Sequence, residues 1–192
     1  ITDKGIRSAG LTDLVLRQIE AVAVPYTVFD DVPVEPSYAQ AQALVDQCGS
    51  IHADLLIAVG GGSVMDAGKL ASMLVSGSLT VKDLLETPGK AKKQIKTVMV
   101  PTTAGTGSEA TPNAIVAVPE KELKVGIVNE NMIADYVVLD AAMIKKLPRK
   151  IAAATGIDAL AHAVECFTSN KANPLSDAFS LPAQKMILHN IE

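Results

Sequence analysis

Two segments rich in small residues carry the residue types in this sequence that suit an anionic ligand. The first, AVGGGSVMDAGK (residues 58–69), places three consecutive glycines between an apolar run and a helical pattern. Backbone N–H groups without side chains can approach a phosphate closely, and the positive end of a helix dipole favours an anion there. The segment matches neither GxGxxG nor GxxxxGK[ST], so two interpretations remain open: a phosphate site, or a tight strand-to-helix turn.

The second segment, PTTAGTGSEAT (residues 101–111), is dense in hydroxyl side chains and also follows an apolar run. Such a loop is unfavourable as a mere connection, but it suits a pyrophosphate and a ribose. The carboxyl ends of neighbouring strands are where open α/β sheets bind their ligands. Together the two segments favour a dinucleotide site over two unrelated turns.

Asp3, at the end of the first apolar residues, is a further candidate for this site. A carboxylate at the end of an early strand can accept hydrogen bonds from an adenosine ribose and repel a 2'-phosphate, which would favour NAD over NADP. An aspartate that caps the following turn explains the residue equally well.

Asp158 and His162 are four residues apart in ATGIDALAHAVE (residues 154–165), a segment with a helical pattern. That spacing places both side chains on one face of a helix, within reach of a shared cation. The alternative is an Asp–His hydrogen bond within a packing face made mostly of Ala, Leu and Val. Two ligands do not hold a divalent metal firmly, and neither His52 nor His189 is a clear third ligand. A complete site would need residues from beyond this sequence or from another chain.

The hydrophobic pattern predicts the elements that would position these residues. Strands alternate with helices up to about residue 147, which predicts an α/β domain with a parallel sheet. We expect strands at 26–32, 54–59, 97–100 and 136–139, the second and fourth buried on both faces, and a hairpin of 114–118 with 124–128. We expect helices at 10–24, 37–48 (capped by Ser37), 64–75, 149–168 and 174–191. The pattern therefore predicts one domain at 1–147 and the start of a helical one at 148–192.

Composition excludes several classes of protein. Hydrophobic residues make up 48% and charged residues 20%, which favours a buried core over disorder. A net charge of -4 with one small lysine cluster offers no broad basic face for nucleic acid. No stretch reaches the ~18 apolar residues of a membrane span, and no signal peptide is evident, so we expect a soluble, cytoplasmic protein with free cysteines. The chain opens on Ile1 rather than Met and stops within a helical pattern, so we expect it to be truncated at both ends.

Three motifs, GGGSVMDAGK, PTTAGTGSEAT and TGIDALAHAVE, occur in order and close to the spacing of one known family. Together they resemble the iron-containing (group III) alcohol dehydrogenases, which include lactaldehyde, propanediol and butanol dehydrogenases, over essentially the whole chain. The resemblance implies a Rossmann-like domain followed by the start of an all-helical domain, a dehydroquinate synthase-like fold, with NAD in the cleft between them. It also implies interconversion of a primary alcohol and its aldehyde, and a homodimer or larger homo-oligomer.

The resemblance further implies roles for residues of both loops. Gly61, Gly62 and Ser63 would hold the pyrophosphate, and the second loop would contact the cofactor through its threonines. Lys124 would reach the ribose or nicotinamide side, and Asp3 matches the family position that favours NAD. The expected cofactor-binding residues are Asp3, Gly61, Gly62, Ser63, Asp66, Thr102, Thr103, Thr106, Ser108 and Lys124.

Asp158 and His162 match the first two ligands of the family's iron site, with Fe2+, or Zn2+, as the metal. In the family two further histidines complete the site, and both lie downstream of Glu192. No residue is expected as a catalytic general base, which suits metal-assisted deprotonation of the alcohol. Because those ligands and most of the helical domain lie outside the 192 residues, we do not expect this chain alone to turn over.

The sequence departs from the family pattern in two further places. Asp140 is followed by Ala141 where proline is usual, and Glu35 precedes Pro36 where asparagine is usual, which puts an adenosine contact in question. Glycerol dehydrogenase and dehydroquinate synthase are metal-dependent alternatives with similar glycine loops. Maleylacetate reductase needs no metal, and the Asp–His pair argues against it. A non-catalytic nucleotide-binding fragment is the alternative from a different class.

Overall fold

The computed structural model describes residues 1–191, which group into two compact units. Unit 1 consists of Ile1–Thr102 and Ser108–Asp140. Unit 2 consists of Thr103–Gly107 and the chain from Ala141 onward. The second loop of the sequence is therefore divided between the units, and the domain limits at residues 147 and 148 stay a prediction.

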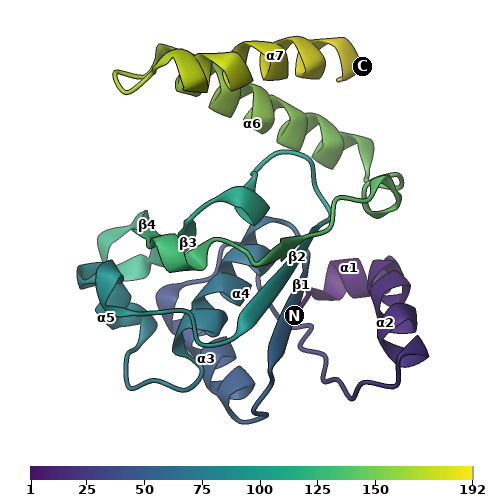
Figure 1. Cartoon of the computed structure of the whole chain (residues 1–192), viewed down its shortest axis with the longest axis vertical. Coiled ribbons are helices and arrows are strands. Elements are labelled where there is room, and N and C mark those ends of the chain that lie inside the picture. Colours follow the sequence, from purple (N-terminus) through teal and green to yellow (C-terminus); the bar gives the residue numbers. More distant parts are fainter. Residues whose placement is uncertain (192) are drawn as a thin grey trace. The chain divides into compact units, whose positions relative to one another are not determined.

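Unit 1 is built on a parallel sheet of order β1-β2-β5 (Figure 1). β1 (Leu55–Gly60) pairs with β2 (Lys96–Pro101) along its whole length, and β2 pairs with β5 (Tyr136–Val137). The prediction of an α/β fold with a parallel sheet is confirmed. Because the strands are parallel, the glycine turn after β1 and the threonines after β2 follow the same edge of the sheet.

Five helices belong to unit 1, and α4 (Gly62–Leu74) lies at its centre, against β1 and β2 (Figure 1). Every residue of α4 from Val64 to Leu74 is buried, including two that carry charges. The core around it contains few aromatic rings and is filled by aliphatic side chains and methionines, which adapt to irregular gaps. The other helices are α1 (Lys4–Ser8), α2 (Leu11–Ala21), α3 (Tyr38–Gly49) and α5 (Val81–Glu86).

The predicted hairpin is confirmed as β3 (Asn113–Val118) and β4 (Leu123–Val128), which pair in an antiparallel ladder. A 3-10 turn at Pro119–Lys121 connects them, and Glu122 completes the reversal with a left-handed φ of 51°. The remaining 3-10 turns lie at Pro88–Lys90, Ser108–Ala110, Glu130–Met132 and Ala141–Met143.

Unit 2 is dominated by two helices that pack on each other, α6 (Arg149–Thr168) and α7 (Pro174–Asn190). Both were predicted, and α6 has the expected limits. Asn173 caps α7 through a reciprocal pair of hydrogen bonds with Ser176. Of the helices in residues 1–191, none is long and apolar enough to cross a membrane.

Two predicted strands differ in the structure. The segment 26–32 forms no regular strand and joins the sheet region through one bond, from Thr2 N to Phe29 O (2.7 Å). The strand predicted at 136–139 was wrong in length and burial, because only Tyr136–Val137 are assigned as strand and Leu139 is 74% exposed. β5 pairs with β2 alone among the described strands, and an apolar run does not distinguish such an edge position from a central one.

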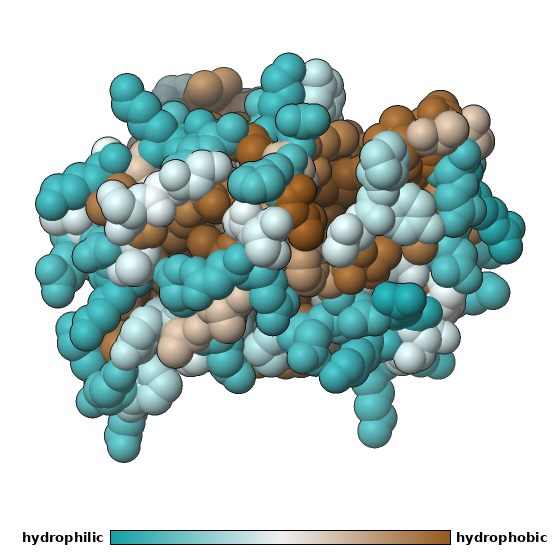
Figure 2. All heavy atoms as spheres, turned by 90° about the horizontal axis from the view of Figure 1, so that it is seen from below, coloured by the Kyte–Doolittle hydropathy of each residue, from teal (hydrophilic) through white to brown (hydrophobic). Residues whose placement is uncertain are grey.

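Hydrophobic residues also reach the surface of unit 1, as the space-filling view shows between the hydrophilic ones (Figure 2). An apolar cavity of about 650 Å³ lies within this unit, lined by α2, the segment that follows it and the near edge of β1. None of the expected cofactor-binding residues lines this cavity. The cavity is therefore separate from the candidate site described next.

Candidate functional site

The glycine turn between β1 and α4 shows both features that the sequence left as alternatives. A Cβ on Gly60 would lie 2.6 Å from Cβ of Val64, so the tight turn needs a glycine for steric reasons. Gly61 is the N-cap of α4 and supplies no side-chain cap, whereas α3, α5 and α7 all begin with capping boxes. Val64 N and Met65 N donate to Gly61 O at 3.1 Å, so only the N–H groups that precede them lack an acceptor within α4, and an anion could serve as one.

The second loop begins beside this turn, because Thr102 N donates to Gly60 O at 3.0 Å. Thr102 is fully buried, and its hydroxyl has no hydrogen-bond partner within the described part of the chain. Leaving a buried hydroxyl unpaired costs about 1–3 kcal/mol. A polar ligand at the glycine turn would relieve that cost, so the residues present fit a phosphate-bearing group.

The middle of the second loop belongs to unit 2, where Gly105 lies against α6. A Cβ on Gly105 would lie 2.5 Å from Thr155 O, and Gly107 has a left-handed φ of 63°. Thr103 and Thr106, two expected cofactor contacts, lie within this stretch. The hydroxyl of Thr103 is buried and also lacks a partner among residues 1–191.

Ser63 and Lys124 are connected through Glu35, the residue that stands where the family has asparagine. The Ser63 hydroxyl accepts a hydrogen bond from Glu35 N at 3.2 Å, and the Glu35 carboxylate forms an ion pair with Lys124. Glu35 has a left-handed φ of 52° at this position. A cofactor that uses Lys124 would therefore share this lysine with Glu35.

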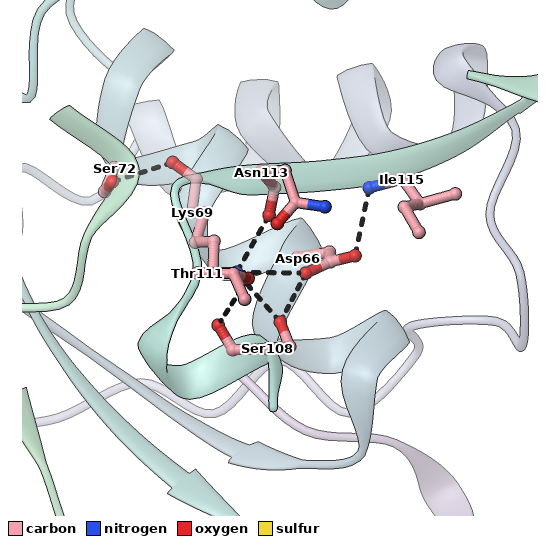
Figure 3. Close-up of polar contacts among 7 residues, drawn as sticks. All are labelled: Asp66, Lys69, Ser72, Ser108, Thr111, Asn113 and Ile115. Carbon is pink, nitrogen blue, oxygen red and sulfur yellow. Dashed lines mark hydrogen bonds and ion pairs between the residues drawn. The ribbon is translucent and has the colours of Figure 1, made fainter. Parts of the chain in front are cut away.

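Asp66 and Ser108 lie in a buried cluster around Lys69 (Figure 3). The Lys69 ammonium donates to Ser108 Oγ (2.9 Å), Thr111 Oγ1 (3.1 Å) and Asn113 O (2.8 Å), and lies 3.2 Å from Asp66 Oδ1. Burial lowers the pKa of Lys69, and the Asp66 carboxylate opposes that shift. We call these five residues the Lys69 cluster.

Asp66 is also held from other directions, since it accepts hydrogen bonds from the Ser108 hydroxyl and from Ile115 N (2.9 Å). Asp66 and Ser108 therefore have structural partners of their own, and their contact with a cofactor stays a prediction. Sequence analysis did not single out Lys69. The sequence did carry a signal for Lys69: it is a lone lysine in an apolar helix, and hydroxyl residues that could bind it follow downstream.

Asp3 caps α1, because its Oδ1 accepts a hydrogen bond from Ile6 N at 2.9 Å. The capping alternative is thus observed. The cap uses one carboxylate oxygen, and the role of Asp3 in cofactor choice stays a prediction.

Asp158 and His162 lie on one face of α6, as their spacing predicted. His162 Nε2 is 3.9 Å from Asp158 Oδ1, and the side chains are 55% and 45% exposed. That distance is too long for a hydrogen bond, so the alternative of a bonded pair in a packing face is not observed. One carboxylate and one imidazole fit Fe2+ or Zn2+ in chemistry, but no cluster of three His, Cys, Asp or Glu that could hold a metal occurs in residues 1–191.

Comparison with known proteins decides the family. The family described as iron-containing alcohol dehydrogenase matches residues 1–141, and the C-terminal part of the Fe-containing alcohol dehydrogenase family matches residues 152–192. The chain belongs to the iron-containing alcohol dehydrogenase family. The resemblance predicted from the three motifs is confirmed.

Individual relatives agree with this assignment. The sulfoacetaldehyde reductase of Bilophila wadsworthia is 34% identical over 100% of this chain and 49% of its own length. The NAD-dependent methanol dehydrogenase of Bacillus methanolicus is 29% identical over 97% of this chain and 49% of its own. The chain thus spans about half the length of the curated relatives it matches.

Solved structures confirm the fold class, a Rossmann-like α/β domain followed by helices. An iron-containing alcohol dehydrogenase from Thermotoga maritima matches 99% of this chain and 52% of its own, with 34% identity and a TM-score of 0.91. A sulfoacetaldehyde reductase from Bifidobacterium kashiwanohense in complex with NAD+ matches 99% of this chain and 50% of its own, with 29% identity and a TM-score of 0.89.

Proposed function

We propose that the whole protein is an NAD-dependent, iron-dependent alcohol dehydrogenase that interconverts a primary alcohol and its aldehyde. Membership of the family supports this activity. The NAD dependence named for the Bacillus methanolicus enzyme and the NAD+ in the Bifidobacterium kashiwanohense structure support the cofactor. The observation that carries the proposal is the uncapped glycine turn of α4 beside the buried, unpartnered hydroxyl of Thr102.

In this proposal the residues of both loops bind and orient the dinucleotide. The backbone at Gly61, Gly62 and Ser63 receives the pyrophosphate at the positive end of α4. Lys124 approaches the ribose or nicotinamide side and divides its charge between the ligand and Glu35. NAD+ supplies the hydride acceptor when bound. The other proposed contacts from the second loop and α4 are Asp66, Thr102, Thr103, Thr106 and Ser108.

Asp3 contributes to the choice between the two dinucleotides. The carboxylate stands at the end of the residues that join the sheet, with one oxygen in the α1 cap. A 2'-phosphate near it would meet like charge, while a ribose hydroxyl can donate to it. We therefore propose NAD rather than NADP as the cofactor.

Asp158 and His162 hold part of the metal site on one face of α6. Their oxygen and nitrogen suit Fe2+, with Zn2+ as an alternative, and further ligands must come from outside residues 1–191. The metal supplies a Lewis acid that acidifies a bound hydroxyl. The half-exposed side chains are free to turn toward a shared cation, and no residue of this chain is proposed as a general base.

The remaining features of the whole protein follow from the family. We propose a small alcohol or aldehyde as substrate, a homodimer or larger homo-oligomer, and a cytoplasmic location, with no role for nucleic acid or membrane. We also propose that the dinucleotide-binding domain covers residues 1–147 and that residues 148–192 begin the metal-binding domain.

Calorimetric titration of the full-length protein with NAD+ and with NADP+, with and without Fe2+, tests the function. We expect NAD+ to bind more tightly than NADP+. A Gly62→Val variant should bind NAD+ at least about tenfold more weakly, because a side chain blocks the approach to the first turn of α4. The control is Gly126→Val on β4, where a Cβ has open space within 4 Å and affinity should not change. Binding of neither dinucleotide would refute the proposal.

A further inference from the structure

Lys69 occupies an unusual place for a charged residue. It lies on α4, two turns beyond the glycine turn or about 10 Å along the helix axis, and its side chain is 0% exposed. A buried ammonium is unfavourable unless oxygens surround it. The partners of Lys69 therefore show what holds it there.

Three separate segments supply those partners (Figure 3). Asp66 comes from the preceding turn of α4, Ser108 and Thr111 from the end of the second loop, and Asn113 from the first residue of β3. An ammonium group has three N–H donors, and four oxygens lie within 3.2 Å of Nζ. Protein groups thus use all of its donors, so Lys69 does not itself bind a ligand.

These contacts fasten the end of the second loop to the helix that starts at the glycine turn. The beginning of the same loop is fastened to the glycine turn by the bond from Thr102 N to Gly60 O. Both attachments lie within unit 1. The separation between the two anion-binding segments is therefore fixed at Thr102 and again at Ser108–Thr111.

Stability alone does not explain a lysine at this position. Apolar side chains of similar volume often replace a buried ion pair with no loss of stability, or with a gain. An apolar side chain at position 69 would fill the volume but could not connect Ser108, Thr111 and Asn113 to α4. What the lysine specifically provides is a fixed position on α4 for the end of the second loop.

We propose that Lys69 is a positioning residue for the dinucleotide: it fixes Ser108–Thr111 on α4 so that the pyrophosphate meets the glycine turn and the second loop together. This inference rests on the proposed dinucleotide site. It implies that the loss of Lys69 weakens the binding of ligands that carry a pyrophosphate. The binding of adenosine, which carries none, should be nearly unaffected.

The test compares Lys69→Met with Lys93→Met in the full-length protein. Lys93 is the matched control because its ammonium also forms an ion pair in unit 1, 2.9 Å from Asp135, but at the amino ends of β2 and β5. Dissociation constants are measured for NAD+, ADP and adenosine, with the melting temperature of each variant. We expect Lys69→Met to bind NAD+ and ADP about tenfold more weakly and adenosine within about twofold, and Lys93→Met to stay within about twofold for all three.

An equal loss of affinity for adenosine would overturn the proposal, since it would show a general loosening of the fold. Unchanged affinity for NAD+ in Lys69→Met would overturn it as well. If Lys69→Met does not fold, Thr111→Val decides instead, because it removes one oxygen from the ammonium at nearly constant volume. We expect Thr111→Val to bind NAD+ about threefold more weakly and adenosine with unchanged affinity. Unchanged affinity for NAD+ would refute the inference. If the unaltered protein does not bind NAD+, the proposed function is refuted. If the unaltered protein binds NAD+ and the variants bind it equally well, only the role of Lys69 is refuted.

Discussion

The Lys69 cluster of unit 1 and the Asp158–His162 pair of unit 2 differ in how far the chain itself fixes their geometry. Lys69 is 0% exposed and surrounded by oxygens from three segments. Asp158 and His162 are about half exposed and 3.9 Å apart, and only the geometry of α6 places them together. Under the proposed function, this difference means that the dinucleotide part of the site is organised before its ligand arrives, whereas Asp158 and His162 acquire their geometry with the metal.

The largest effect expected from this difference concerns two aspartates. Asp66→Ala leaves the Lys69 ammonium buried without its counter-charge and should lower the free energy of unfolding by about 3–5 kcal/mol. Asp158→Ala removes a half-exposed carboxylate and should change it by less than about 0.5 kcal/mol. Urea unfolding of both variants measures the two values. Similar losses in the free energy of unfolding at the two positions would contradict the comparison, because they would show that the chain fixes both sites equally.

The next effect concerns the glycine turn, where the anion site is proposed. Gly60→Ala places a Cβ 2.6 Å from that of Val64, so the turn or the start of α4 must shift. We expect a loss of about 1–3 kcal/mol in the free energy of unfolding, as for other overpacked positions. Gly126→Ala, with open space around the added carbon, is the control. If both variants unfold alike, the turn is not the tightly packed element described above.

A smaller effect concerns pH and extends the comparison to a second carboxylate of unit 1. Burial alone would raise the pKa of Asp135, but the Lys93 ammonium and the bonds from Thr97 outweigh it and hold the pKa below its ordinary value of 3.8. A lowered pKa contributes stability above the ordinary value, and that contribution is lost as the pH falls through the folded pKa. Asp135→Asn should therefore be less stable by about 1–2 kcal/mol at neutral pH, and the difference should shrink below about pH 3.8.

Chemical denaturation between neutral and acidic pH checks this prediction. Asp158→Asn serves as the comparison from unit 2, because its carboxylate is 45% exposed and lies 3.9 Å from the His162 ring nitrogen. A constant deficit for Asp135→Asn at all pH values would contradict the ion-pair explanation.

The smallest effect without ligand is expected at the metal pair. His162→Ala should change the melting temperature little in metal-free protein, because the side chain is 55% exposed. Adding Fe2+ or Zn2+ should raise the melting temperature of the full-length protein, since a ligand that binds only the folded state stabilises it, and His162→Ala should abolish that rise. His189→Ala on α7 should retain it. A metal-dependent rise that survives in His162→Ala would remove His162 from the site.

Sequence predicted the elements whose patterns are long and regular. The helix at 149–168 was found because it extends over 20 residues, and the hairpin strands were found because they flank the turn residues Pro119–Lys121. The short helices α1 and α5 were missed, since their limits depend on single caps at Asp3 and Thr80 rather than on periodicity.

The candidate site was predictable where it is local in sequence. The glycine turn lies within a few residues, and Asp158 with His162 within one helical turn, so spacing alone places them. The Lys69 cluster was not predictable in this way, because its hydroxyl and carbonyl partners follow Lys69 by 39, 42 and 44 residues. Only the fold brings Ser108 and Thr111 to the lysine.

Amide hydrogen exchange of the full-length protein with and without NAD+ tests most directly that the glycine turn and the start of the second loop form the dinucleotide site. We predict that NAD+ slows exchange at Gly61, Gly62, Ser63 and Thr102, while amides around the apolar cavity near α2 are unchanged. Slower exchange confined to the cavity would contradict this assignment of the dinucleotide site. Unchanged exchange at the glycine turn despite saturating NAD+ would contradict it as well.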